Sequence, residues 1–421
     1  MKWLYNISIW LYGNGLLIAS VFNPKAALWI RGRKNWKSEI KKQFVDNTKT
    51  VAWFHCASLG EFEQGRPLLE AYTEKYPQHR ILLTFFSPSG FEVRKNYSGA
   101  HSIIYLPLDL PSNVRFFLDT VKPAIAIFIK YEFWLNFIHG LSDRNIPLLL
   151  VSSNFRPQQH FFKWYGGFFR KGLKKVNQFF VQTQTSADLL KNIGIQAIVS
   201  GDTRFDRVLQ ISKNKQRFPL VEKFCAGNKI LIGGSTWPKE EEMLYQFYQN
   251  KSKDTKLIIA PHETHEGHIQ QIQQLFGEKT VLFTELDTTD FSDKDVLIIN
   301  TIGKLSHLYQ YAHLALIGGG FGVGTHNILE AVNFGLPVIF GPNHRYFYET
   351  KALAAEGGAF PISGTEDFLH ITSDILYNDE KLLHLKKICL EFIQKHCGAT
   401  AIVMGEIEKT NVTLRPCASF L

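Results

Sequence analysis

Short apolar runs alternate with amphipathic stretches along most of the chain. From Thr50 onward, the apolar runs stand at residues 51–55, 81–85, 103–106, 125–129, 148–152, 179–182 and 197–200. A second series occupies residues 230–233, 257–261, 281–283, 296–299, 314–317 and 338–340. Short buried strands separated by helices are typical of parallel sheets that carry helices on both faces. The pattern therefore predicts an α/β protein with two parallel sheets.

A polar break separates the two series. The alternation stops near residues 205–219, which contain the segment Lys213-Asn-Lys-Gln-Arg217. A chain of 421 residues is also too long for one simple core and suggests two domains of about 200 residues each. The expected divisions are an N-terminal segment 1–24, a first domain 25–212, a second domain 213–385 and C-terminal helices 386–421.

The N-terminal segment is apolar and uncharged between residues 3 and 22. It is barely long enough to span a bilayer, and it carries aromatic residues at its front. A basic cluster follows it, formed by Arg31, Arg33, Lys34, Lys37, Lys41 and Lys42. Interfacial aromatic residues with a trailing basic cluster predict an anchor that holds the protein on the cytoplasmic leaflet. A buried N-terminal helix is the alternative.

The charge balance narrows the choice of partner. The net charge of +9 and the pI of about 9.1 favour an anionic partner. No nucleic-acid-binding motif is present, so a membrane surface and phosphorylated substrates are favoured over nucleic acid. Five cysteines, at positions 56, 225, 389, 397 and 417, form no CxxC pair. Their spacing fits a reducing compartment better than a zinc ribbon or a disulfide framework.

A glycine-rich stretch follows the strand predicted at residues 314–317. Glycines 318, 319, 320, 322 and 324 precede Asn327 and a helical pattern that begins at Ile328. A glycine turn before a helix exposes backbone N–H groups to an anion, and Glu330 in the first turn can accept hydrogen bonds from ribose hydroxyls. Its late position, and the lack of an acidic residue after the next strand, match a dinucleotide fingerprint poorly. An ordinary tight turn is the remaining alternative.

Two further strand ends carry candidate chemistry. Glu61 begins a helix after the strand at residues 51–55, where it can act as a general base, with Gly60 granting access. A helix-stabilising glutamate is the alternative. Ser235 and Thr236 precede a proline-started helix and can hold a phosphate, although a well-capped helix would look the same.

Three histidines follow the strand at residues 257–261. His262, His265 and His268 share no helix face and lack the HExxH spacing. A zinc site is therefore not favoured, and loop groups that face a nucleotide are the preferred interpretation.

The segment Trp53-Phe-His-Cys-Ala-Ser-Leu-Gly-Glu-Phe-Glu-Gln-Gly-Arg-Pro67 resembles the signature of the 3-deoxy-D-manno-octulosonic acid (Kdo) transferases. The resemblance continues through Glu132-Phe-Trp, Gln182-Thr, Gly201-Asp-Thr-Arg-Phe-Asp206, Gly233-Gly-Ser-Thr236 and the glycine stretch. It implies a GT-B fold, in which two Rossmann-like domains face a cleft and C-terminal helices return to the first domain. It also implies an inverting transfer of Kdo from CMP-Kdo to the lipid A precursor, without metal or cofactor, on the cytoplasmic face of the inner membrane.

The same resemblance assigns roles to individual residues. Glu61 is the expected general base. The expected CMP-Kdo-binding residues are Ser235, Thr236, His262, Gly319, Gly320, Asn327 and Glu330. The expected acceptor or cleft residues are Ser58, Gly60, Arg66, Lys130, Glu132 and Arg204. His262 stands where the family usually has arginine, and Arg204 where it usually has lysine.

Two other functions remain compatible with these residues. One is a GT-B-fold sugar-nucleotide epimerase, which needs neither a membrane nor a lipid acceptor. The other is a non-catalytic, membrane-bound nucleotide-binding protein, which would bind CMP without consuming the donor.

Overall fold

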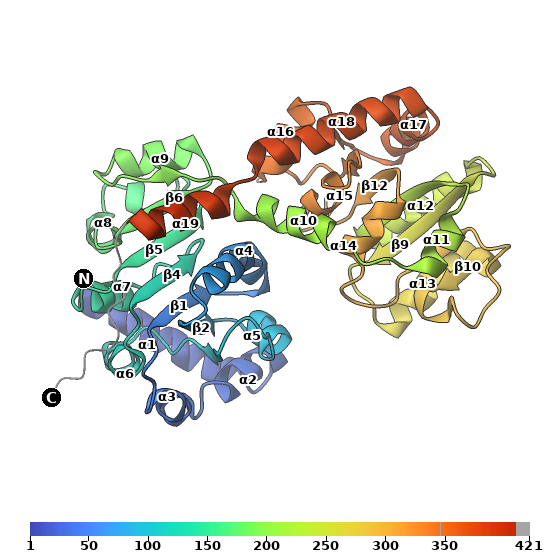
Figure 1. Cartoon of the computed structure of the whole chain (residues 1–421). Helices are drawn as coiled ribbons and strands as arrows, with labels where there is room; N and C mark the ends of the chain where they lie inside the picture. The colour runs from blue at the N-terminus through green and yellow to red at the C-terminus, as the bar shows by residue number, and fades with distance from the viewer. Residues whose placement is uncertain (346, 410–421) are drawn as a thin grey trace. The chain divides into compact units, whose positions relative to one another are not determined.

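The chain folds into two compact units, each built on a seven-stranded parallel sheet (Figure 1). The structure is a computed structural model, and it describes residues 1–345 and 347–409. The first unit comprises Met1–Arg207 together with the chain from Cys397, and the second comprises Val208–His396. The prediction of two parallel sheets flanked by helices is confirmed.

The first sheet has the strand order β3-β2-β1-β4-β5-β6-β7. Its strands are β1 (Val51–Cys56), β2 (Arg80–Phe85), β3 (Ser102–Tyr105), β4 (Ile125–Ile129), β5 (Leu148–Ser153), β6 (Gln178–Val181) and β7 (Ile198–Val199). The order reverses between β1 and β4. In open parallel sheets, ligands bind beyond the carboxyl ends of the strands at such a point, so this edge is where a site is expected.

Two apolar layers cover this sheet because alternate side chains of each strand point to opposite faces. Trp53 packs with α3, α6 and α7 on one face, whereas Phe54 packs with α4 and α19 on the other. The helices of this unit are α1 (Lys2–Ala19), α2 (Pro24–Arg31), α3 (Trp36–Phe44), α4 (Leu59–Lys75), α5 (Pro88–Arg94), α6 (Pro111–Val121), α7 (Leu135–Ser142), η1 (His160–Phe162), α8 (Gly167–Leu173), α9 (Gln184–Lys191), the start of α10 (Thr203–Lys213) and α19 (Ala399–Lys409).

The second sheet has the order β10-β11-β9-β8-β12-β13-β14, and its reversal lies between β8 and β12. Its strands are β8 (Lys229–Thr236), β9 (Thr255–Pro261), β10 (Thr280–Leu282), β11 (Val296–Ile298), β12 (Leu314–Ile317), β13 (Val338–Phe340) and β14 (Ala359–Pro361). The sequence pattern missed β14, a short edge strand that ends in proline. The helices of this unit are α11 (Pro219–Cys225), α12 (Pro238–Asn250), α13 (Glu266–Phe276), η2 (Gly277–Lys279), η3 (Phe283–Glu285), α14 (Leu305–Leu308), η4 (Tyr309–Tyr311), α15 (Leu329–Val332), α16 (Tyr348–Ala355), α17 (Thr365–Leu376) and α18 (Asp379–His396).

The unit boundaries differ from the expected positions after residues 212 and 385. The chain passes between the units after Arg207, inside α10, and again after His396, so α18 belongs to the second unit and only α19 packs on the first. The Asp206 carboxylate holds this return, because it accepts hydrogen bonds from the backbone amides of Gly398 and Thr400, each at 2.6 Å. Residues 410–421 of the expected C-terminal segment, Cys417 among them, lie outside the described residues.

The N-terminal helix α1 lies against the carboxyl edge of the first sheet. The Tyr5 hydroxyl donates to the Asp109 carboxylate at 2.6 Å, and the Tyr12 ring stacks on Phe86 at 6.2 Å between centroids. The opposite side of α1 exposes Trp3 and Trp10, which are 64% and 56% accessible. Within the described residues, a single helix with the length and apolar character of a membrane span does not occur, although α1 and α2, bent by 120° at their junction, meet both criteria as a pair.

Arg33 does not contribute to the basic surface that the sequence suggested. Its side chain is buried, and its guanidinium donates to the carbonyls of Leu106 at 2.8 Å and Phe86 at 2.7 Å. The same group lies 3.7 Å from the Trp29 ring centroid. Burial lowers the pKa of Arg33 to about 9, so the side chain stays charged at neutral pH. Arg33 therefore attaches the N-terminal helices to the sheet edge.

Candidate functional site

Glu61 stands at the carboxyl end of β1, in the first turn of α4. Its side chain is half-buried, and its carboxylate accepts a hydrogen bond from the Ser58 hydroxyl. A Cβ added at Gly60 would meet only the Ser58 Oγ, at 3.9 Å, so the approach to this turn is open. Burial, followed by the charges of Glu61, Glu132 and Glu63, raises the pKa of the Cys56 thiol, which shows how closely carboxylates gather at this edge.

Glu132 is buried at the end of the neighbouring strand β4 and is held by two donors. His55 Nε2 lies 2.9 Å from its Oε2, and the Trp134 indole donates to the same oxygen at 2.6 Å. His55 Nδ1 in turn lies 2.8 Å from the Thr84 hydroxyl. These contacts fix the carboxylate at the sheet edge. His55 was not among the residues predicted from the sequence. A histidine inside an apolar strand was nevertheless a usable signal, because a fully buried imidazole needs hydrogen-bond partners.

Lys130 and Ser152 occupy strained backbone positions at the ends of β4 and β5. Their φ angles are +72° and +55°, in the left-handed region that side chains other than glycine rarely adopt. The Lys130 carbonyl accepts from the Ser153 hydroxyl at 2.9 Å, which supports the turn. Such strain is concentrated at functional sites. The structure thus places Lys130 beside Glu132 at the edge where an acceptor site is expected.

Arg66 and Arg204 are both held by carboxylates of the first unit. Arg66 donates to Glu70 at 2.6 Å on the same helix. Arg204 binds the buried Asp202 at 2.7 Å. Burial raises the pKa of Asp202, but the Arg204 charge and hydrogen bonds from Arg204 and Gln64 outweigh it and hold the pKa below its usual value. Both arginines therefore shape this edge through ion pairs within the unit.

In the second unit, the glycine turn after β12 approaches the end of β8 very closely. A Cβ at Gly318 would lie 2.0 Å from the Ser235 carbonyl oxygen, and one at Gly320 would lie 2.5 Å from the Gly341 nitrogen. Glycine is therefore required for packing of the strand ends. Ser235 itself has a φ of +53° and is half-buried.

The amides of this turn bind a carboxylate of the protein. Glu240, buried on α12, accepts from the Gly319 amide at 3.0 Å and from the Trp237 amide at 3.2 Å, and it also binds the Phe321 amide. From the sequence, these amide donors were expected to face an anionic ligand. The expected anion position is instead filled by Glu240, because α12 brings its first turn against the glycine turn.

The helix after the glycine turn is shorter than the pattern suggested. Only Leu329–Val332 is helical, so little dipole is available there. Asn327 still acts locally, since its side chain accepts from the Leu329 amide at 3.1 Å and donates to Glu330 at 3.3 Å. Glu330 is half-buried in this arrangement. Thr236, expected near a phosphate, is fully buried, and its hydroxyl donates to Glu241 at 2.9 Å.

Three rings form a stack beside Ser235. The ring centroids of Trp237 and His262 lie 4.8 Å apart, with an angle of 24° between the ring planes. The centroids of His262 and His326 lie 4.4 Å apart, with an interplanar angle of 22°. The Trp237 indole also donates to His326 Nε2 at 3.2 Å. Burial, followed by the neighbouring His262, lowers the pKa of His326.

The three histidines after β9 serve different purposes, because His268 binds Glu241 and His265 caps α13. Sequence reasoning missed Trp237 and His326, since only the sheet order brings them to His262.

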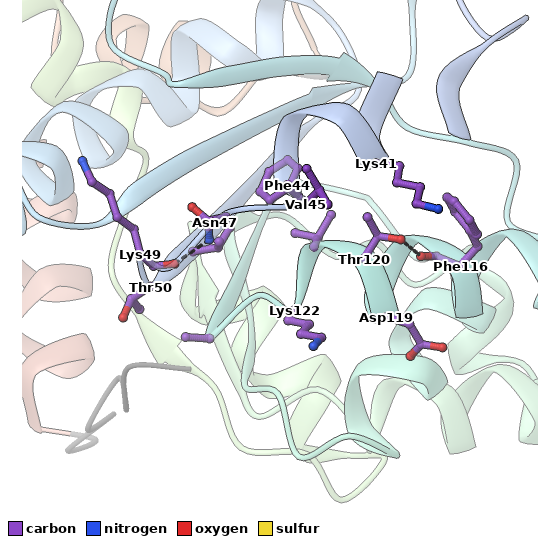
Figure 2. Close-up of a pocket in the computed structure, with 13 residues that line it drawn as sticks. Lys41, Phe44, Val45, Asn47, Lys49, Thr50, Phe116, Asp119, Thr120 and Lys122 are labelled. Atoms are coloured by element: carbon purple, nitrogen blue, oxygen red, sulfur yellow. Dashed lines mark hydrogen bonds between the residues drawn. The ribbon is translucent and has the colours of Figure 1, made fainter. Parts of the chain in front are cut away.

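A cavity of about 370 Å³ lies at the opposite edge of the first sheet (Figure 2). Lys41, Lys49 and Lys122 line it together with the ends of α3 and α6 and the beginning of β1. Lys41 lies in the last turn of α3 and Lys122 directly after α6, where a positive charge offsets the negative end of the helix dipole. This cavity is therefore separate from the carboxyl edge that carries Glu61 and Glu132.

Comparison with known proteins supplies relatives that match most of the chain. The family described as 3-deoxy-D-manno-octulosonic-acid transferase (kdotransferase) matches residues 34–207. The 3-deoxy-D-manno-octulosonic acid transferase of Aquifex aeolicus (strain VF5) is 29% identical over 349 residues, which cover 81% of this chain and 90% of that protein. The protein of the same name from Rickettsia bellii (strain RML369-C) is 25% identical over 371 residues, which cover 85% of this chain and 87% of that protein.

Solved structures resemble the chain in fold. A UDP-GlcNAc 2-epimerase from Neisseria meningitidis bound to UDP-GlcNAc has a TM-score of 0.61 and 15% identity, covering 86% of this chain and 100% of that one. A putative UDP-N-acetylglucosamine 2-epimerase from Listeria monocytogenes has a TM-score of 0.59 and 12% identity, with coverage of 86% and 96%. At this level of identity the likeness concerns the fold alone, which is of the GT-B type.

Proposed function

We propose that this chain, a glycosyltransferase of the 3-deoxy-D-manno-octulosonic acid (Kdo) transferase family, moves Kdo from CMP-Kdo to a lipid A precursor. The observation that carries the proposal is the similarity to proteins of that name, which extends over both sheets rather than over one. The site geometry is compatible with the chemistry.

Glu61 is the general base of the proposed reaction. Its carboxylate takes the proton of an acceptor sugar hydroxyl while the oxygen forms a bond to the anomeric carbon of Kdo. The bond from that carbon to the phosphate oxygen breaks on the opposite face, so CMP leaves and the configuration inverts. Three features support the assignment: the position at a strand end, the partial exposure and the orienting Ser58 hydroxyl.

The acceptor is proposed to bind at the carboxyl edge of the first sheet. Glu132, held by His55 and Trp134, offers a fixed carboxylate that can accept hydrogen bonds from sugar hydroxyls. Lys130 lies beside it and can meet an anionic group of the acceptor. The donor is proposed to bind at the corresponding edge of the second sheet, near Ser235 and His262, with Glu330 at the ribose.

The protein is proposed to work on the cytoplasmic face of the inner membrane. The exposed apolar side of α1 supports this, together with the excess of basic residues. The place of α1 supports it further. A chain of contacts leads from α1 to Glu132. The Tyr12 ring stacks on Phe86, the ring centroids of Phe86 and Trp134 lie 4.6 Å apart, and the Trp134 indole donates to Glu132. A lipid-anchored acceptor would thus reach the proposed site directly from the surface that α1 contacts.

The test is incubation with CMP-Kdo and a tetra-acylated lipid A precursor, with the product mass as the readout. We expect Glu61→Gln to bind CMP as the wild type does and to lose about 10²–10⁴-fold in transfer rate, the usual contribution of a general base. Glu74→Gln on the exposed side of the same helix is the matched control and should transfer normally. Near-normal turnover of Glu61→Gln would remove Glu61 from this role.

The same assay separates the two alternatives. A wild-type protein that binds CMP but consumes no donor in the presence of acceptor would be a nucleotide-binding protein without catalysis. Interconversion of a sugar nucleotide in the absence of any lipid would instead indicate an epimerase. Either result would contradict the proposed transfer.

A further inference from the structure

The donor edge of the second sheet needs a positive group that the glycine turn does not supply. In many nucleotide sites, backbone amides of a glycine turn and a helix N-terminus hold the phosphate. Here Glu240 occupies the Gly319 and Phe321 amides, and α15 is only one turn long. A phosphate at this edge must therefore find its counter-charge on side chains.

The ring stack beside Ser235 has the geometry to supply that charge. The Trp237 and His326 rings, joined by their own hydrogen bond, both pack against His262, which is exposed to solvent. His326 is half-buried, and its Nε2 accepts from the Trp237 indole at 3.2 Å. A proton on that nitrogen would break this hydrogen bond. Two imidazolium rings 4.4 Å apart would also repel each other. His262 and His326 together can therefore carry one added proton. The solvent-exposed His262 is the ring able to hold it.

We propose that His262 takes up a proton when the phosphate of a cytidine nucleotide binds, with the neutral His326 and Trp237 rings fixing its position. This deepens the proposed function, on which it rests for the identity of the nucleotide. An imidazole is largely neutral above pH 7 in water, and a nearby phosphate dianion stabilises its charged form. The site would then bind the departing CMP more tightly at lower pH.

Other charged groups near the stack are already engaged. On α12, Glu240 is bound to backbone amides, and Lys239 Nζ lies 4.4 Å from the centroid of the Phe321 ring. On the loop that carries His262, Glu263 pairs with His265 at 3.4 Å. Beyond His326, Glu330 binds Asn327. His262 is therefore the group at this stack whose protonation most directly responds to an incoming phosphate.

The experiment measures CMP binding to the full-length protein by calorimetry at pH 7.5, in two buffers with different ionisation enthalpies. A phosphate monoester loses its second proton near pH 6, so free CMP is already a dianion and does not obscure proton uptake by the protein. We expect uptake of about half a proton per CMP bound. Cytidine, which lacks the phosphate, should bind without uptake.

Two substitutions at position 262 distinguish charge from shape. His262→Gln should lose the uptake and bind CMP about tenfold more weakly at pH 6.5, with little change at pH 8.5. His262→Arg, which is permanently charged, should also lose the uptake but keep its affinity across this pH range. His384→Gln, an exposed histidine on α18, should behave as the wild type does.

The results that overturn the inference are specific. Wild-type binding without proton uptake, or unchanged uptake in His262→Gln, would show that another group or none responds to the phosphate. An affinity of His262→Arg for CMP that still depends on pH would also show that another group responds to the phosphate. A protein that fails to bind CMP at all would refute the proposed function as well, whereas binding without uptake would refute only the role of His262.

Discussion

The contact between Glu240 and the glycine turn gives a quantitative prediction about the stability of the second unit. Glu240 is 1% exposed, and its carboxylate accepts from the backbone amides of Trp237, Gly319 and Phe321. Replacing it by alanine leaves two amides of the glycine turn and the amide of Trp237, the residue before α12, without their acceptor. Each unpaired buried donor costs about 1–3 kcal/mol.

Part of that cost is offset. Burial raises the pKa of Glu240 even though the amide hydrogen bonds lower it, which means that the ionised carboxylate is itself costly to bury. The amides next to the turn can also reach water once the side chain is removed. We therefore expect Glu240→Ala to lower the free energy of unfolding by about 3 kcal/mol, and Glu240→Gln, which keeps one acceptor oxygen, by about 1–2 kcal/mol.

The assay is guanidinium unfolding of the full-length protein, followed through the second unit. Trp237 is the only tryptophan between residues 208 and 396, so the tryptophan fluorescence of variants that lack the other tryptophans reports this unit. Glu242→Ala, exposed on the same helix, is the matched control and should change stability by no more than about 0.5 kcal/mol. If Glu240→Ala were as stable as that control, the carboxylate would not be what holds the glycine turn.

Two further predictions concern the first unit. Burial raises the pKa of Asp109 to about 6, above the value near 3.9 of an unfolded chain, so the folded state favours the protonated form. Its contribution is therefore largely present at pH 4 and is lost as the pH rises through 6. The stability difference between wild type and Asp109→Asn should fall by about 2 kcal/mol between pH 4 and pH 6 in urea unfolding, and a flat difference would refute the assignment. The second prediction is that replacing both Trp3 and Trp10 by serine reduces sedimentation with vesicles containing anionic lipid by about tenfold, with neutral vesicles as the reference, and unchanged sedimentation would remove α1 from membrane binding.

Local pattern alone was enough for much of the fold. The apolar runs located all but one of the strands, because a buried parallel strand needs a continuous apolar segment whatever its neighbours are. The position of Glu61 at a strand end could also be read directly, since β1 and α4 adjoin in the chain. In these cases the determining interactions lie within a few residues of each other.

The pairing of distant segments was decided only by the tertiary structure. Sheet order brought Glu240 to the Gly319 amide, His326 to His262 and Glu132 to His55, and each pair is separated by more than 60 residues. It also buried Arg33, which in the sequence is one basic residue among several. A charged or polar side chain carries no local mark of the partner that it will meet, so the sequence could propose which residues are chemically capable, whereas the fold determined which of them are already engaged with the protein.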